Sequence, residues 1–207
     1  MKIVKYILVI AILIGPAQLL AAAFSHYDAD TQDIISKPTP DVFSVCFDHS
    51  CQTVETHSIT WQEWKQVTTP LETPGESAEK ERHAIAAAIA IMEEIVGQRT
   101  GTYQDLGENL RGFGKTGQMD CIDESTNTNT YLYMLEQAGY LKWHKLLDRS
   151  TRFGIFAGMP HTTAVIEEIN SHTRYAVDSW FFDNGKPPAI VELSAWKKGW
   201  DPGDTPE

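Results

Sequence analysis

In the first half of the chain, apolar side chains recur at the three-to-four-residue spacing of a helix. The clearest run holds Ile85, Ile89, Met92 and Val96. This spacing predicts a helix over about Ala78–Val96, with Ser77 as its N-cap and Gly97 as its end. The segment before it, residues 68–75, contains two prolines and a glycine and is predicted to be a linker.

The glycine-rich stretch of residues 97–118 shows little periodicity and is predicted to be mainly loop, with a short helical piece. A second helix is predicted from Asp120 or Cys121 to about Ala138. Its early part, residues 125–130, is a run of Ser, Thr and Asn, which are poor helix formers. We therefore expect packing against other elements to hold this part of the helix.

β-branched and aromatic residues dominate after the second helix. They predict strands at Lys142–Leu147, Thr162–Ile169 and Arg174–Phe182, the last two forming an antiparallel hairpin around residues 170–171. An earlier hairpin is predicted within Val42–Ile59. Helices followed by mainly antiparallel strands indicate an α+β fold.

Residues 1–23 have the parts of a secretory signal peptide. Lys2 and Lys5 precede the apolar run Ile7–Ile14, and small residues end the segment at Ala21–Ala23. The apolar run is shorter than the about 20 residues that cross a bilayer. We expect cleavage after Ala23, a periplasmic or secreted protein and no stable membrane insertion, with a retained membrane anchor as the alternative.

The net charge of the chain limits the classes of molecule that it is expected to bind. The first 23 residues hold two of the 17 Lys and Arg residues and none of the 28 Asp and Glu residues, which leaves a formal net charge of −13 on the remainder. Nucleic acid and anionic membrane are poor partners for such an acidic chain, whereas a peptide or protein substrate is compatible. The remainder is expected to divide into an N-terminal arm and hairpin, residues 24–75, and a catalytic domain, residues 76–207. The sequence carries no signal for an oligomeric state.

Three cysteines in an exported chain predict one disulfide and one free thiol. Cys46 and Cys51 lie in the predicted first hairpin, so a disulfide between them is the main interpretation. The alternative is a metal site made by Cys46, His49 and Cys51, which lacks a fourth ligand at metal-site spacing. The disulfide leaves Cys121 as the odd thiol.

Cys121 lies where a turn meets the predicted second helix, a position at which the helix dipole lowers a thiol pKa. A cysteine nucleophile also needs an imidazole, which in turn needs a carboxylate or amide to orient it. His161 begins one strand of the predicted C-terminal hairpin and Asp178 lies on the other. A turn centred near residues 169–170 would place the two opposite each other, and a later turn would stagger them.

The motifs Asp120-Cys121-Ile122-Asp123, His161-x-x-Ala-Val and Tyr175-x-Val-Asp178 occur in this order. This order resembles the transglutaminase-like superfamily, closest to the bacterial transglutaminase-like cysteine proteinases, over about His83–Phe182. The resemblance implies a papain-like core with helices packed on an antiparallel sheet, and a Cys121–His161–Asp178 catalytic triad. The chain departs from the family in the polar run after Cys121, in the segment that contains Cys46 and Cys51, and in lacking a clearly placed Arg on the strand after the helix.

Asp120, Asp123 and Glu124 surround the candidate nucleophile. Asp120 and Asp123 can form a capping box that stabilises the helix by about 1 kcal/mol. However, carboxylates beside a thiolate raise the thiol pKa, and a bound cation would relieve this repulsion. Oxygen ligands favour Ca²⁺, and some members of the resembled family bind calcium beside the nucleophile, so a calcium site at these three residues is a second interpretation. No other cofactor is expected.

Other residues have two interpretations each. Gln118, with the backbone N–H of Cys121, is a candidate oxyanion donor or a loop residue. His144 competes with His161 as the histidine of the site. A set of C-terminal aromatic residues either lines a cleft or covers the core: Trp180, Phe181, Phe182, Trp196 and Trp200.

These patterns predict a cysteine-dependent acyl-transfer enzyme. Cys121 would attack a carbonyl, His161 would serve as base and then acid, and Asp178 would orient His161. Hydrolysis of a peptide or isopeptide bond is the leading reaction, and transamidation uses the same acyl-enzyme. The alternative function is a non-catalytic exported binding module that recognises a protein or glycan partner.

Overall fold

The computed structural model describes residues 34–72, 77–109, 115–155 and 159–203. The predicted signal peptide, residues 1–23, lies outside the described residues. Asp33–Glu207 belong to one compact unit, so the first hairpin and the helices that follow are parts of the same body. The fold is α+β, as the sequence indicates, with helices packed against antiparallel sheets.

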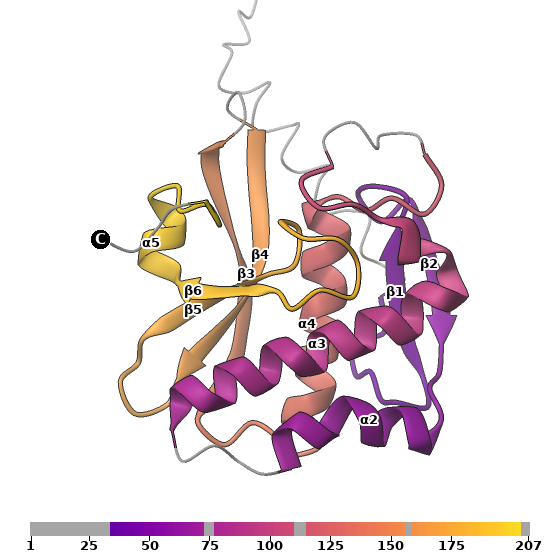
Figure 1. Cartoon of the computed structure of the whole chain (residues 1–207), viewed down its shortest axis with the longest axis horizontal. Helices are drawn as coiled ribbons and strands as arrows, with labels where there is room; N and C mark the ends of the chain where they lie inside the picture. Colours follow the sequence, from indigo (N-terminus) through magenta and orange to yellow (C-terminus); the bar gives the residue numbers. More distant parts are fainter. Residues whose placement is uncertain (1–33, 73–76, 110–114, 156–158, 204–207) are drawn as a thin grey trace, which may run out of the picture. The chain divides into compact units, whose positions relative to one another are not determined.

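The central element is the helix α4 (Cys121–Gln137), which begins at the free cysteine. It lies between a hairpin and a four-stranded sheet (Figure 1). The hairpin consists of β1 (Phe43–Phe47) and β2 (Thr53–His57). The sheet has the order β3-β4-β5-β6, with each neighbouring pair antiparallel. Its strands are β3 (His144–Ile155), β4 (Met159–Glu168), β5 (Arg174–Asp178) and β6 (Ala189–Glu192).

The strand predictions are confirmed in kind and differ in extent. β3 continues eight residues beyond the predicted end at Leu147, and β6 was not predicted. A register shift lies between Leu147 and Ser150, so the strand continues through an irregularity that interrupts its alternating pattern. The short helix α5 (Leu193–Lys197) follows β6 and carries Trp196 into the core.

The predicted linker at residues 68–75 is wrong over its first part, because the helix α2 (Trp61–Glu72) includes these residues and contains Pro70. The sequence does contain a local signal for the start of this helix. Thr60 and Glu63 form a capping box: the Glu63 backbone N–H donates to Thr60 Oγ1, and Glu63 Oε2 accepts from the Thr60 backbone N–H at 2.7 Å.

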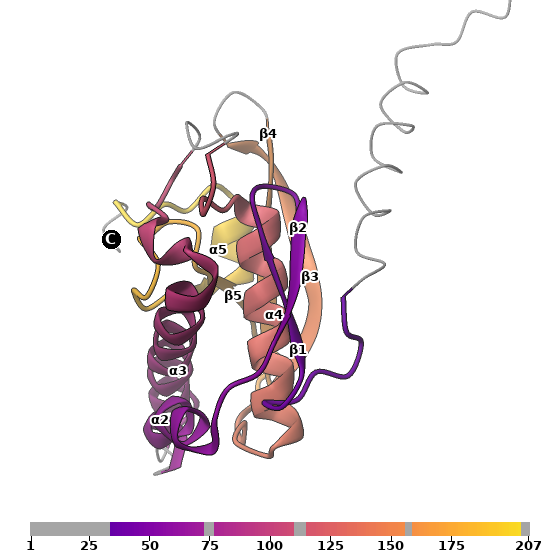
Figure 2. The ribbon, with the colours of Figure 1, turned by 90° about the vertical axis from the view of Figure 1, so that its right-hand side faces the viewer.

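The helix α3 (Ala78–Thr100) begins as predicted, with the Ser77 side chain accepting from the Lys80 backbone N–H. The predicted end at Gly97 is wrong, because the helix ends at Gly101, where φ is +84°. The absence of a side chain at Gly97 instead allows Asn184 to approach the helix closely. A Cβ added there would lie 2.5 Å from Asn184 Oδ1. Helices α3 and α4 lie next to each other (Figure 2). Both contribute side chains to the hydrophobic core.

The polar run of α4 is buried, as expected for a segment held by packing. Asn127 Oδ1 accepts from the Cys46 backbone N–H at 2.8 Å, and Asn127 Nδ2 donates to the Cys46 carbonyl at 2.7 Å. Thr128 is within hydrogen-bond distance of Ser179 on the C-terminal side of β5. This polar face therefore joins the helix to the hairpin on one side and to the sheet region on the other.

Candidate active site around Cys121

The structure joins two of the three predicted catalytic side chains by a hydrogen bond. His161 Nε2 on β4 lies 2.7 Å from Asp178 Oδ2 on β5, and both side chains are buried. Ala164 pairs with Val177, so Asp178 falls next to Thr163 in the ladder and is staggered by two positions from His161. The imidazole spans this diagonal. The bond orients His161 so that Nδ1 is the other ring nitrogen, the one that can exchange a proton.

Trp196 completes this arrangement and was not given this role from the sequence. Its Nε1 donates to the same Asp178 Oδ2 at 2.7 Å. Ring centroids of Trp180, Phe181 and Trp196 lie 4.8, 5.6 and 5.5 Å from that of His161. These three aromatic residues are buried, so they form the packing around His161 and cover the core.

Arg152 on β3 was also not predicted. It pairs with His161 in the β3–β4 ladder and its guanidinium lies 4.4 Å from the Trp196 ring centroid. It donates to the carbonyl oxygens of Trp196 and Trp200, the latter at 2.9 Å. Arg152 thus ties the C-terminal segment to the sheet beside the buried pair.

Cys121 is half-buried at the first position of α4. The backbone N–H of Thr162, the residue after His161, hydrogen-bonds to the Cys121 sulfur and lowers its pKa. The structure therefore brings Cys121 beside the chain segment that carries His161. Asp120 accepts from the backbone N–H groups of Ile122, Asp123 and Glu124. The N–H of Cys121 is not among these donors and is therefore a backbone candidate for hydrogen bonding to an oxyanion.

Burial and nearby charge keep the Cys121 thiol protonated. Burial is the largest cause, and the charges of Asp120, Asp178 and Asp123 add to it, raising the pKa to about 12. The expected lowering by the helix dipole is therefore outweighed. Any reaction of this thiol near neutral pH requires a base beside it, because the thiolate is the nucleophilic form.

Asp120 and Asp123 form the predicted capping box at the start of α4. Both carboxylates also accept hydrogen bonds from the loop between β1 and β2. Asp123 accepts from the backbone N–H groups of His49 and Cys51, at 2.8 and 2.6 Å. Asp120 accepts from the backbone N–H and hydroxyl of Ser50, each at 3.0 Å. Their oxygens are thus bound by N–H and O–H donors.

Glu124, the third acidic residue, lies in a different environment. It is buried and hydrogen-bonds with Asp105, and its pKa is raised by burial and by the charges of Glu93 and Asp105. Burial also raises the pKa of Glu93 and of Asp105 to about 7. Glu93 and Glu124 line a cavity of about 10 Å³, about the space that one water molecule needs. Glu93 lies four residues after Ile89, on the apolar face of α3, and a carboxylate at such a position is the sequence signal for this buried group.

Within the described residues, one group of three potential metal ligands has its atoms within 4.8 Å of one another, and it is Cys46, Cys51 and Asp123. The first two form the predicted disulfide, so their sulfurs are not thiolate ligands. The side chains of Asp120, Asp123 and Glu124 are not brought together in this way. Calcium binding by these residues stays a prediction, which a melting temperature measured with and without a chelator would test.

Gln118 is buried and hydrogen-bonds within its loop. Its Nε2 donates to the Gln104 carbonyl at 2.8 Å, and its Oε1 accepts from Asn109 Nδ2. These bonds indicate a loop-bracing residue, and a role as oxyanion donor stays a prediction. His144, the competing histidine, is buried in another pair: its Nδ1 lies 2.9 Å from Glu81 Oε1.

No protein-family model, no curated protein and no solved structure matches this chain. Among the described residues, no helix has the length and apolar character needed to cross a membrane.

Proposed function

We propose that this protein is an exported cysteine-dependent acyl-transfer enzyme, a peptidase or amidase with a papain-like core. The observation that carries this proposal is the buried His161–Asp178 hydrogen bond, with the residue after His161 in contact with the Cys121 sulfur. Nucleophilic catalysis by a cysteine requires an oriented imidazole within reach of a thiol, and the contact of Thr162 with the Cys121 sulfur supports such a placement of His161. The Cys46–Cys51 disulfide supports an oxidising compartment.

The reaction begins as the thiol proton moves to His161 Nδ1 and the sulfur attacks the substrate carbonyl carbon. The resulting oxyanion accepts a hydrogen bond from the Cys121 N–H. His161 then donates the proton to the leaving amine as the C–N bond breaks, which leaves a thioester on Cys121. Water completes hydrolysis, and a second amine completes transamidation. Because the pKa of Cys121 is raised to about 12, proton transfer accompanies attack and does not precede it.

Alkylation of Cys121 by iodoacetamide tests this role without knowledge of the substrate. At mildly acidic to neutral pH, the wild-type protein should react about 10²-fold or more faster than His161→Gln, the scale of general-base assistance. Asp178→Asn should fall between the two, because it keeps an acceptor for His161 and loses the charge. Mass spectrometry of the peptide that contains Cys121 gives the rate.

A second candidate function is a non-catalytic binding module, favoured by the raised pKa of Cys121, which is typical of an inert buried thiol. This candidate predicts that Cys121 reacts equally slowly with and without His161. Equal rates would overturn the enzyme proposal. In that case the next experiment would be a search for protein or glycan partners. If the rates differ, the next experiment would be a substrate search with activated esters and peptide amides.

A further inference from the structure

The loop from Cys46 to Cys51, called here the disulfide loop, has an unusual backbone. Four consecutive non-glycine residues, Asp48, His49, Ser50 and Cys51, have φ values of +66°, +68°, +55° and +53°. A left-handed conformation is unfavourable for each such residue and occurs mostly as single residues. The disulfide joins Cys51, the last residue of this run, to Cys46, which lies two residues before its first. The run therefore needs an outside constraint, and the covalent link supplies one.

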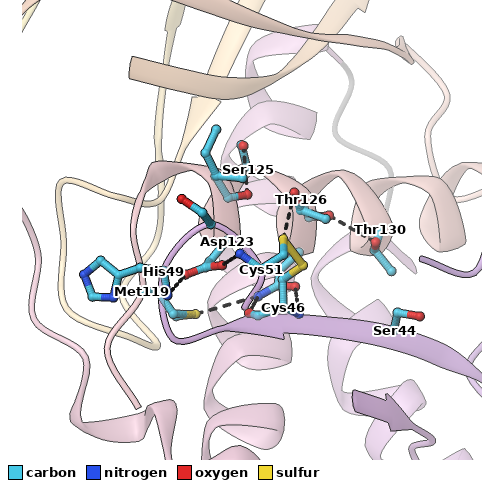
Figure 3. Close-up of a disulfide and its surroundings, with 12 residues drawn as sticks. Ser44, Cys46, His49, Cys51, Met119, Asp123, Ser125, Thr126 and Thr130 are labelled. Atoms are coloured by element: carbon cyan, nitrogen blue, oxygen red, sulfur yellow. Dashed lines mark hydrogen bonds between the residues drawn. A yellow bond between two sulfur atoms is a disulfide. The ribbon is translucent and has the colours of Figure 1, made fainter. Parts of the chain in front are cut away.

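This backbone turns successive N–H groups toward the start of α4. The N–H groups of His49 and Cys51 reach the two oxygens of Asp123, and Ser50 reaches Asp120 through its N–H and its hydroxyl. Figure 3 shows the Asp123 carboxylate between the disulfide and the backbone at His49. A series of N–H groups on such a curved backbone forms an anion-binding concavity. Here the bound anions are side chains of the protein itself.

Cys121 lies between these two aspartates in the sequence and shares the first turn of α4 with them. Asp123 is fully buried, so it depends on the loop donors that reach it. Without them, a buried carboxylate loses hydrogen bonds that water does not replace, and the first turn of the helix must rearrange. The position of the Cys121 thiol is thus coupled to the loop conformation in which these N–H groups bind Asp120 and Asp123.

We propose that the disulfide loop is a redox-sensitive positioning element, which holds the first turn of α4 in place while the disulfide is intact and releases Cys121 to solvent when it is reduced. The reductant is a dithiol or a phosphine, which supplies two electrons while two protons convert the bridge to the Cys46 and Cys51 thiols. The left-handed run then relaxes, and its N–H groups leave Asp120 and Asp123. This coupling does not require that Cys121 be catalytic.

The test compares the His161→Gln protein with the triple variant Cys46→Ser/Cys51→Ser/His161→Gln. That background removes the proposed base, so failure of the proposed function leaves this test intact. The alkylation rate of Cys121 by iodoacetamide at about pH 8 is expected to rise about tenfold or more in the variant that lacks the disulfide. Amide hydrogen exchange of Ile122 and Asp123 is expected to accelerate in parallel.

One control variant, in the same His161→Gln background, separates local release from general destabilisation. Ser77→Ala removes the N-cap of α3, far along the chain from this turn, and should leave the Cys121 rate and the exchange of Ile122 unchanged. If the triple variant does not fold, the folded His161→Gln protein treated with a phosphine serves instead, with alkylated Cys46 and Cys51 peptides reporting reduction. An unchanged or slower Cys121 rate in the folded reduced protein overturns the proposal.

Discussion

Replacing Asp178 tests the buried network most directly. One oxygen, Asp178 Oδ2, accepts bonds of 2.7 Å from both His161 Nε2 and Trp196 Nε1. The three residues are 2%, 4% and 0% exposed, so water does not substitute for a lost acceptor. A hydrogen bond to a charged group contributes about 1.5–3 kcal/mol. Asp178→Ala is therefore expected to lower the free energy of unfolding by roughly 3–6 kcal/mol.

Asp178→Asn is the matched variant, because its amide oxygen can accept both bonds without a charge. Neutral hydrogen bonds contribute about 0.5–1.5 kcal/mol each, so this variant should retain part of the stability. Urea unfolding followed by far-ultraviolet circular dichroism gives both values, and a double-mutant cycle with Trp196→Phe isolates the coupling. A loss below about 1 kcal/mol in Asp178→Ala, the size of an ordinary surface substitution, would refute the network.

Three further predictions concern stability. Burial raises the pKa of Glu93 and of Asp105 to about 7, so the folded state keeps protons that the unfolded chain releases. The free energy of unfolding should therefore fall as pH rises from about 4.5 to above 7. Urea unfolding across this pH range should show a smaller fall in Glu93→Gln than in the wild-type protein. Gly97→Ala should destabilise by about 1–2 kcal/mol despite the better helix propensity of alanine, since its Cβ meets Asn184; a raised melting temperature would contradict this. Removing the disulfide should cost about 2 kcal/mol, measured by urea unfolding, for a bridge between residues five positions apart, and no cost would show that the reduced chain is equally constrained.

The elements that were predicted correctly are those with local chemical signals. Ser77 caps α3 and Asp120 caps α4 through hydrogen bonds to residues two or three positions on, so the sequence contains both partners. Gly97 shows the opposite case. A glycine beyond an apolar run is typical of a helix end, but here its missing side chain makes room for Asn184, 87 residues away in the sequence. No local pattern distinguishes these two uses.

The same division applies to the site. His161 and Asp178 could be paired because a hairpin joins their strands, so their separation in sequence limits their separation in space. Trp196 and Arg152 could not be assigned roles, because their contacts with the pair depend on how β6 and α5 return across the sheet and on an irregular part of β3. The raised pKa of Cys121 likewise follows mainly from burial. The charge pattern of the sequence contains no information on burial, so it underestimates this pKa shift.

Two departures from the resembled family now have one physical explanation. A polar run stands where the resembled family usually has an apolar helix, and a cysteine-containing hairpin precedes the helices within the same compact unit. In the structure these features contact each other: Asn127 binds both backbone groups of Cys46, as a neighbouring strand would, and Thr126 lies 3.9 Å from the Cys51 sulfur. An apolar helix face would leave these two backbone groups of Cys46 without the Asn127 partner, and a polar face without the hairpin would leave the Asn127 amide without them. The hairpin and the polar face of α4 therefore require each other, and a substitution such as Asn127→Leu should destabilise the hairpin and the helix together.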